Sequence, residues 1–499
     1  MLEFFTANMA PIIFVSMVIF MLVGFPVAFA LAANGVVFGL IGIEMGLLGP
    51  QLFQALPDRI FGVMANDTLL AIPFFTFMGL ILERSGMAED LLDTIGQLFG
   101  PLRGGLALAV IFVGALLAAT TGVVAASVIS MGLISLPIML RYGYDKKLAT
   151  GVIAASGTLA QIIPPSLVLI IMADQLGKSV GDMYAGAFLP GFVLTGLYVG
   201  YVVLVSIFKP TWAPALPLEA RSLRGTKLFL RVLTTLVPPL LLIFLVLGTI
   251  FMGIATPTEG GAMGATGALI MAMARKRLSW KLLKQAMDTT AKLTTFVVFI
   301  LVGARVFSLT FYGVDGHRWV EHLLTGLPGG QLGFLIVVNV LVFLLAFFLD
   351  FFELSFIVVP LLGPVADKLG IDLIWFGILL AVNMQTSFMH PPFGFALFYL
   401  RSVAPPTIKT TDIYWGAIPF VCIQIIMIGL VIAFPQMVSW NLDKDKVVDL
   451  DSVTIDMPAS DYGAPPAPAG LESPQPGTPG GAEDPNKAIM DSMKPDQPK

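Results

Sequence analysis

Two stretches of this chain share one unusual pattern, because each places small polar residues and a Pro-Pro pair inside an apolar run long enough to span a bilayer. The first covers residues 155–166 and the second covers residues 383–394. Proline lacks the backbone N–H that a helix interior requires, so both runs are predicted to be broken helices. Lipid cannot satisfy the backbone groups that a break frees, whereas ions and polar solutes can. Paired breaks at matching places in two halves of a chain are typical of secondary-transporter binding sites.

The remaining sequence has the composition of a membrane protein. Of its 499 residues, 57% are hydrophobic and 12% are charged, whereas a soluble domain carries about 25% charged residues. Apolar runs of roughly 18 or more residues recur along the chain, so we predict an all-α polytopic membrane protein. The first run lacks a basic flank and a cleavage site, and is predicted to be retained. A single cysteine, Cys422, excludes a disulfide framework within the chain, and nothing indicates nucleic-acid binding.

The two halves show the same order of segments. Each is predicted to hold two spans, an amphipathic stretch, a third span, a second amphipathic stretch, a hairpin, a broken helix and a last span. In the first half these segments lie at 10–32, 34–48, 51–61, 68–82, 87–99, about 106–140, about 148–172 and 184–207. In the second half they lie at 230–251, 259–274, 280–290, 293–309, 319–327, about 334–365, about 373–400 and 413–434.

This order predicts two repeats, at 1–208 and 230–435, joined by a cytoplasmic linker at 209–229. The segment 440–499 is rich in Pro, Gly, Asp and Ser, and is predicted to be a disordered periplasmic tail. Each hairpin leg is short: about 14 residues rise about 21 Å, less than the roughly 30 Å hydrocarbon core. We therefore expect re-entrant hairpins, with two short tilted spans as the alternative.

Hairpins that enter and leave on one face give each half an odd number of crossings, so the second repeat is predicted to be inverted. Charge supports this tracing. One face collects the basic clusters near 141–147, 221–231 and 275–284. The other face holds only Arg59, Lys178, Arg318 and Lys368 before the tail. The positive-inside rule makes the first face cytoplasmic, so both termini are predicted to be periplasmic.

The hairpin tips and helix breaks form two candidate Na⁺ clusters, because hydroxyl, amide and freed carbonyl oxygens are hard ligands. The first cluster contains Thr120, Thr121, Gly122, Ser156, Gly157 and Thr158. The second contains Asp350, Asn383, Gln385, Thr386 and Ser387. For any one hydroxyl, the alternative is a hydrogen bond to its own helix or across a helix interface. Two clusters at matching positions favour a binding site.

Other polar residues are candidates for contacting a substrate: Pro164, Pro165, Ser166, His390, Pro391 and Arg305. Arg305 lies deep in a predicted span, where it binds a carboxylate, pairs with an acid or snorkels outward. His390 is either a pH-sensitive group or a polar lining residue. Glu259 follows Pro257 at a predicted helix start and fits a capping role. The sequence contains no ATPase-type phosphate loop and no nucleophile–base pattern, so an ion gradient is favoured over ATP, and a transporter over a membrane-embedded enzyme.

At these residues the chain resembles the large membrane subunit of tripartite ATP-independent periplasmic (TRAP) transporters of the dicarboxylate type. The matching pieces lie at 69–75, 85–87, 156–166, 256–259 and 383–394. The sequence departs from the family pattern at the first tip (Thr120-Thr121-Gly122), at His390, where Thr is usual, and at Gly260-Gly261, where Ala-Ala is usual. The segments 351–353 and 393–399 resemble members that carry 2-oxo acids or other monocarboxylates.

The resemblance implies a Na⁺-coupled importer of organic acids in the bacterial inner membrane, with no organic cofactor. In this family a mobile part, made of the two hairpins and two broken helices, moves against a scaffold in an elevator mechanism. Members work with a small four-helix membrane subunit and a soluble periplasmic substrate-binding protein. The family's Na⁺ sites fall here on the two clusters named above. The alternative is a stand-alone Na⁺/divalent-anion symporter of a related elevator fold.

Overall fold

The chain folds into helices that follow its apolar runs. The computed structural model describes residues 2–121, 124–221, 223–391, 394–440 and 442, and the described helices form one compact unit that ends at Leu442. Among these residues, six helices are long and apolar enough to cross a membrane, or up to eight if each of two bent helix pairs is one span. The predicted tail beyond Leu442 lies outside the described residues.

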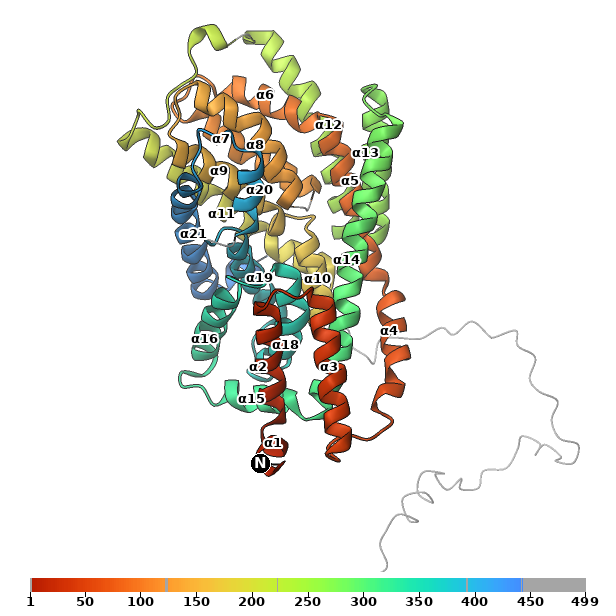
Figure 1. Cartoon of the computed structure of the whole chain (residues 1–499). Helices are drawn as coiled ribbons and strands as arrows, with labels where there is room; N and C mark the ends of the chain where they lie inside the picture. Colours follow the sequence, from red (N-terminus) through yellow and green to blue (C-terminus); the bar gives the residue numbers. More distant parts are fainter. Residues whose placement is uncertain (1, 122–123, 222, 392–393, 441, 443–499) are drawn as a thin grey trace, which may run out of the picture. The chain divides into compact units, whose positions relative to one another are not determined.

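The first half contains helices α1 to α11 (Figure 1). Their bounds are α1 Leu2–Ala7, α2 Met9–Leu22, α3 Val27–Glu44, α4 Leu56–Met64, α5 Ala71–Arg84, α6 Met87–Phe99, α7 Gly105–Thr121, α8 Val124–Arg141, α9 Lys146–Thr158, α10 Leu167–Leu176 and α11 Val180–Phe208. Short 3₁₀ turns at Leu52–Ala55 and Asp67–Leu70 precede α4 and α5.

The second half contains helices α12 to α22. Their bounds are α12 Gly225–Phe251, α13 Pro257–Ala274, α14 Trp280–Gly313, α15 Gly316–Thr325, α16 Gly330–Leu345, α17 Phe351–Glu353, α18 Val359–Lys368, α19 Leu373–Met384, α20 Phe395–Val403, α21 Thr410–Ala433 and α22 Gln436–Ser439. A π-helical turn, Leu354–Val358, joins α17 to α18. At the start of α13, Thr256 and Glu259 form a capping box, which confirms the predicted capping role of Glu259.

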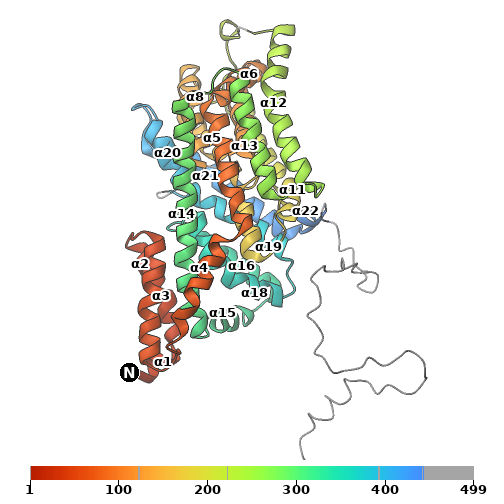
Figure 2. The ribbon, with the colours of Figure 1, turned by 90° about the vertical axis from the view of Figure 1, so that its right-hand side faces the viewer.

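Helices at corresponding positions of the two halves make corresponding contacts with the other half. The third helix, α3, packs on α14 of the other half, and α13 packs on α5 in the corresponding way. Likewise α2 contacts α15, while α12 contacts α6. The crosswise helix α6 lies at the upper end of the bundle and α15 at its lower end (Figures 1 and 2). The fold class is therefore the predicted one, with two inverted repeats that each hold a hairpin and a broken helix.

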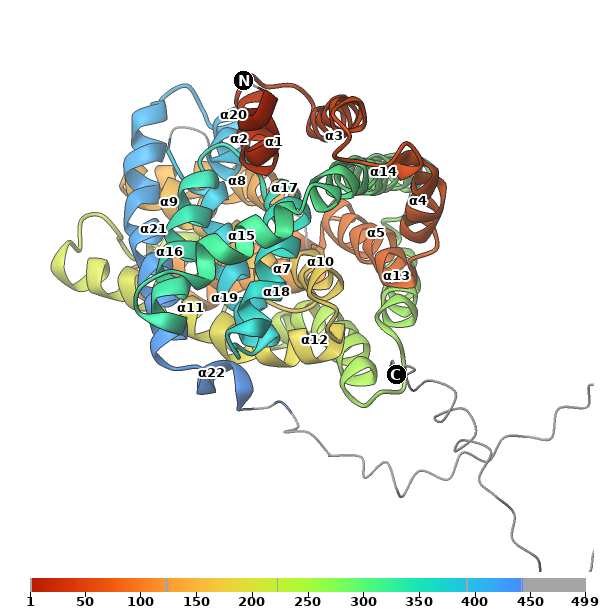
Figure 3. The same cartoon turned by 90° about the horizontal axis from the view of Figure 1, so that it is seen from below.

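Two groups of helices lie on opposite sides when the bundle is seen from below (Figure 3). One side holds α3, α4, α5, α13 and α14, and the other holds α9, α16 and α21. Both legs of the first hairpin, α7 and α8, pack on α9, and α16 and α18 of the second hairpin pack on α19. Each broken helix is thus held by the hairpin of its own repeat.

Two predicted boundaries were wrong. The predicted span 10–32 is divided, because Gly24 has a left-handed φ of 88° and Pro26 precedes α3 instead of continuing α2. The stretches 280–290 and 293–309, predicted as separate elements, form the single 34-residue helix α14. No Gly or Pro lies between them, so the helix continues for about 51 Å.

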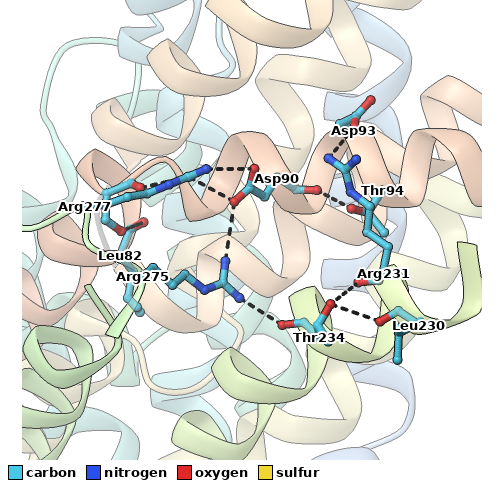
Figure 4. Close-up of polar contacts among 10 residues, drawn as sticks. Leu82, Asp90, Asp93, Thr94, Leu230, Arg231, Thr234, Arg275 and Arg277 are labelled. Carbon is cyan, nitrogen blue, oxygen red and sulfur yellow. Dashed lines mark hydrogen bonds and ion pairs between the residues drawn. The ribbon is translucent and has the colours of Figure 1, made fainter. Parts of the chain in front are cut away.

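Acidic residues of α6 connect this crosswise helix to the second half at the upper end (Figure 4). Asp90 pairs with Arg275 at 3.5 Å and with Arg277 at 2.9 Å, just after α13. Asp93 pairs with Arg231 of α12 at 2.9 Å. These side chains are partly exposed, so each pair contributes at most about 1 kcal/mol. Their common role is to fix where α6 lies against α12 and α13.

Candidate functional site

The first break lies between α9 and α10 and contains Pro164 and Pro165. Helix α9 begins with Asp145, whose side chain accepts from the N–H groups of Lys147 and Leu148. It ends at Thr158, passes through the 3₁₀ turn Leu159–Gln161 and resumes only at Leu167. Between these points lies the cis peptide bond Pro164–Pro165. The Ser166 hydroxyl donates to the carbonyl of Gln161 at 2.6 Å and closes this non-helical segment.

The second break has the same construction. Helix α19 ends at Met384, continues as the 3₁₀ turn Gln385–Phe388 and resumes as α20. The N–H of Gly394 donates to the carbonyl of His390 at 2.6 Å. A Cβ at Gly394 would lie 2.6 Å from the Phe388 carbonyl oxygen, so this tight return requires glycine. Pro391 lies in this return and is half-buried.

The two breaks meet in the interior. Gln385 donates from Nε2 to Oγ1 of Thr158 at 3.1 Å, which links the second broken helix to the first. Gln424 of α21 donates to the hydroxyl of Tyr198 of α11 at 2.9 Å, and this hydroxyl lies beside Thr158. All four side chains are fully buried. The structure therefore brings Thr158 of the first predicted cluster together with Gln385 of the second.

Three of the predicted hydroxyls donate to their own helix, as the alternative interpretation expected. Ser156 donates to the carbonyl of Val152 at 2.7 Å, Thr158 to Ala155 at 2.8 Å and Thr386 to Asn383 at 2.6 Å. A hydroxyl that donates a hydrogen bond still has two oxygen lone pairs, which can bind a cation or accept another hydrogen bond. These bonds are thus compatible with cation binding, and they orient the oxygen.

Several buried oxygens at the breaks have no hydrogen-bond partner among the described residues. They are Gln161 Oε1, Asn383 Oδ1, Gln385 Oε1 and Ser387 Oγ. A buried polar atom without a partner costs roughly 1–3 kcal/mol, so several in one region point to a ligand. Amide and hydroxyl oxygens are ligands for hard cations. Among the described residues, no three His, Cys, Asp or Glu side chains are grouped so that they could hold a metal ion.

The hairpins approach the breaks closely. A Cβ at Gly114 of α7 would lie 2.5 Å from the Ser156 Cβ, and one at Gly157 would lie 3.2 Å from the Val128 backbone nitrogen of α8. On the other side, Asn383 donates to both the carbonyl and Oδ1 of Asn339 of α16, at 2.8 and 2.9 Å. Each break is therefore held directly by a hairpin leg.

The tips are less completely described. Gly122 and the side chains of Thr120 and Thr121 lie outside the described residues, so their predicted role stays a prediction. At the second tip, Asp350 Oδ1 accepts from the N–H of Glu353 at 2.9 Å, while Glu353 accepts from the N–H of Asp350 at 2.9 Å. This capping box gives Asp350 a structural role at the tip.

Two substrate candidates lie in distinct environments. His390 is buried between Phe343 and Phe347, with ring centroids 4.3 Å from each, and neither ring nitrogen has a partner among the described residues. Arg305 is not brought to the breaks. It lies on α14 and lines a separate cavity with Arg59 of α4.

Sequence reasoning missed four polar residues in this region: Asn339, Ser355, Tyr198 and Gln424. Ser355 lies 3.7 Å from the sulfur atoms of both Met172 of α10 and Met384 of α19. Asn339 and Gln424 are amides inside apolar runs, and that alone was a usable signal. Tyr198 and Ser355 are ordinary in such runs, and only the tertiary contacts reveal them.

Inverted repeats, hairpins and broken helices that meet at a polar interior define a multi-span transport protein. The chain belongs to the family described as tripartite ATP-independent periplasmic transporter, DctM component, whose model matches residues 14–437. The large permeases of this family translocate substrate, are not enzymes, and work with a substrate-binding protein and usually a small membrane subunit.

Individual relatives agree with this assignment. The chain is 30% identical over 391 residues to the C4-dicarboxylate TRAP transporter large permease protein DctM of Pseudomonas aeruginosa, covering 78% of this chain and 89% of that protein. It is 28% identical to the isethionate TRAP transporter permease protein DctMQ of Oleidesulfovibrio alaskensis, covering 80% of this chain and 61% of that protein. The crystal structure of the Alcanivorax borkumensis YdaH transporter shares the fold, with a TM-score of 0.54, 15% identity and coverage of 78% and 89% of the two chains.

Proposed function

We propose that this large permease is the substrate-translocating subunit of a Na⁺-coupled, receptor-dependent importer of organic acids. The observation that carries the proposal is the set of buried, unpartnered oxygens at the two breaks. Na⁺ is bound by such oxygens, and its binding would offset the cost of burying them. Hydroxyls already oriented by their own helices, at Ser156, Thr158 and Thr386, add further oxygen ligands.

The proposed sodium positions keep the two predicted clusters, with Gln161 as an added ligand candidate. Ser156, Gly157 and Thr158 lie where the legs of the first hairpin press on α9. Asn383 lies where α16 contacts α19, and the 3₁₀ turn that follows contains Gln385, Thr386 and Ser387. Sodium bound at these places would fix each hairpin against its broken helix. The empty carrier would then differ from the loaded carrier in how firmly these parts are joined, which is the basis of coupling.

The substrate class is proposed to be carboxylates, with 2-oxo acids as one candidate. One relative carries the name of a C4-dicarboxylate and another that of isethionate, a sulfonate, so both names are of organic anions. The first N–H groups of a helix have no partner within the helix, so α10 and α20 each offer donors to an anion at the breaks. Pro164, Pro165, Ser166, His390 and Pro391 border these helix starts.

The proposed assembly includes a small four-helix membrane subunit and a soluble periplasmic substrate-binding protein. The chain would lie in the bacterial inner membrane with both termini periplasmic. Repeats at 1–208 and 230–435 would provide the hairpins and broken helices of the mobile part. In this arrangement α3, α5, α13 and α14, which pair across the halves, would form the scaffold.

The test is uptake into proteoliposomes that contain the large permease with its small subunit. The external receptor is supplied with the radiolabelled acid that it binds. We expect uptake to require both the receptor and an inward Na⁺ gradient. Equal uptake with choline in place of Na⁺ would overturn the coupling. Uptake without the receptor would instead favour the stand-alone symporter.

A further inference from the structure

Two arginines line a cavity that α10 and the second hairpin also border. Its volume is about 290 Å³, close to the roughly 300 Å³ lower end of small-molecule pockets. Arg59 of α4 and Arg305 of α14 line one side, together with Tyr312 and Ser308. The lining also includes Gln175 of α10 and, from the second hairpin, Phe356 and Pro360.

The two arginines of this cavity have exposed side chains and no ion-pair partner among the described residues. Neither guanidinium forms an ion pair or a hydrogen bond with any residue that the structure describes. The described lining residues include neither Asp nor Glu. An arginine inside a membrane-spanning helix is costly unless water or an anion compensates it. Arg305 lies eight residues before the end of α14, or about 12 Å along the helix.

One acid lies beside the cavity, but its carboxylate is already used. Asp174 precedes Gln175 in α10, and it accepts at Oδ1 from Nδ2 of Asn66 at 2.6 Å. Its Oδ2 accepts from Nε2 of Gln175 at 2.7 Å. Both oxygens of Asp174 therefore accept from neutral amides, and Asp174 forms no ion pair with either arginine.

The cavity is adjacent to the break region. Its lining residue Phe356 follows Ser355, whose hydroxyl lies 3.7 Å from the sulfur of Met384, the last residue of α19. Gln385 of the second break comes next in sequence. The second hairpin thus lines the cavity with Phe356 and contacts the end of α19 with the preceding residue, Ser355.

We infer that Arg59 and Arg305 form a carboxylate-binding vestibule between α4 and α14 on one side and α10 and the second hairpin on the other. Arginine suits this ligand because its planar fork donates two parallel hydrogen bonds to a carboxylate. The inference that the transported organic acid passes through this vestibule rests on the proposed function. The inference that the vestibule binds a carboxylate depends only on the cavity and its two arginines.

The test uses a single reporter cysteine in the full-length protein, with Cys422→Ser as background and Ser308→Cys as the reporter. The rates of reaction with an anionic and a cationic methanethiosulfonate reagent are compared in phosphatidylcholine nanodiscs without Na⁺. We expect the anionic reagent to be favoured. The rate ratio should fall at least about threefold in Arg305→Gln and in Arg59→Gln, which is the effect of one nearby charge in water-like surroundings. Choline succinate should slow labelling at constant ionic strength, and only while both arginines are present.

Arg318→Gln is the matched control, because it removes one positive charge from α15 at the same end, where Arg318 pairs with Asp315 at 3.6 Å. It should leave the rate ratio and the succinate protection unchanged. If Ser308→Cys does not fold, Tyr312→Cys replaces it as the reporter, because Tyr312 also lines the cavity and is exposed. An unchanged ratio in the arginine variants, or no protection by succinate, would overturn the vestibule.

Two further arms separate the possible failures. Protection by phosphatidylglycerol nanodiscs but not by succinate would assign the arginines to a lipid headgroup and overturn the inference. Na⁺-driven uptake that persists without succinate protection would defeat the vestibule alone. Protection by succinate in a protein whose uptake ignores Na⁺ would defeat the proposed coupling and leave the vestibule standing.

Discussion

At the scale of single residues, two buried amide side chains at the second break use their hydrogen-bond donors but not their oxygen acceptors. Gln385 donates to Thr158, yet its Oε1 has no partner among the described residues, and Asn383 donates twice to Asn339 while its Oδ1 has none. The donors are used and the acceptors remain. This asymmetry favours a cation over an anion at these atoms, because a cation binds oxygens and not N–H groups.

Replacing Thr386 by Val should weaken Na⁺ activation of uptake about tenfold, since losing one oxygen ligand costs roughly 1–2 kcal/mol. The measurement is the Na⁺ concentration for half-maximal uptake. Thr266→Val is the control, because Thr266 also donates to its own helix, at 2.9 Å, but lies on α13. A Na⁺ titration that is the same in both variants would remove Thr386 from the sodium site.

Asp350→Asn separates capping from ion binding at the second tip. Asn caps a helix about as well as Asp, so thermal stability should change by less than about 1 kcal/mol. If Asp350 also contributes charge to the second sodium cluster, as we propose, half-maximal uptake should require about tenfold more Na⁺. Normal Na⁺ dependence in a stable Asp350→Asn protein would leave this residue with the capping role only.

At the scale of elements, close packing positions the broken helices. A Cβ at Gly151 of α9 would lie 2.1 Å from the carbonyl oxygen of Gly416 in α21, and one at Gly416 would lie 2.3 Å from the carbonyl oxygen of Lys147. Small residues let two membrane helices approach in this way. The first break therefore depends on α21, an element from the other half of the chain.

Gly416→Val should destabilise the protein by at least about 2–3 kcal/mol, because the added methyl groups meet backbone and not flexible side chains. The measurement is thermal unfolding of the purified protein in detergent. Gly429→Val is a matched control in the same helix, because nothing lies within 4 Å of a Cβ placed there. Equal melting temperatures for the two variants would contradict the close approach of α9 and α21.

The sequence predicted the elements that have a local cause. The breaks were predicted from prolines 164, 165, 391 and 392, and the hairpins were predicted from short apolar legs. The division at Gly24–Pro26 also had a local cause and was overlooked. The continuity of α14 could not be read from an amphipathic stretch next to an apolar one, because both are helical. Partners such as Asn339 for Asn383 depend on tertiary packing, which one sequence does not contain.

At the scale of the whole molecule, polar contacts join α5 to the hairpin and broken-helix side at both of its ends. Glu83 accepts from the Ser130 hydroxyl of α8 at 2.5 Å. At the other end, Asn66, just before α5, donates to Asp174 of α10. If the hairpins and broken helices move against α5, both contacts must break during transport.

A disulfide between Glu83→Cys and Ser130→Cys, in a Cys422→Ser background, should therefore reduce uptake more than tenfold. Reduction of the disulfide should restore it. Each single cysteine variant treated with the same oxidant serves as control. Full uptake with a confirmed crosslink would show that α5 and α8 stay together throughout the cycle, contrary to an elevator motion.

The central claim is that sodium binds at the two helix breaks, and binding of radioactive sodium to the purified permease in nanodiscs measures this directly. We expect saturable binding that excess unlabelled Na⁺ displaces and excess K⁺ does not, and that is lost when Thr158→Val and Thr386→Val are combined. Saturable binding of full amplitude and affinity in that double variant, or none in the wild type, would contradict the account.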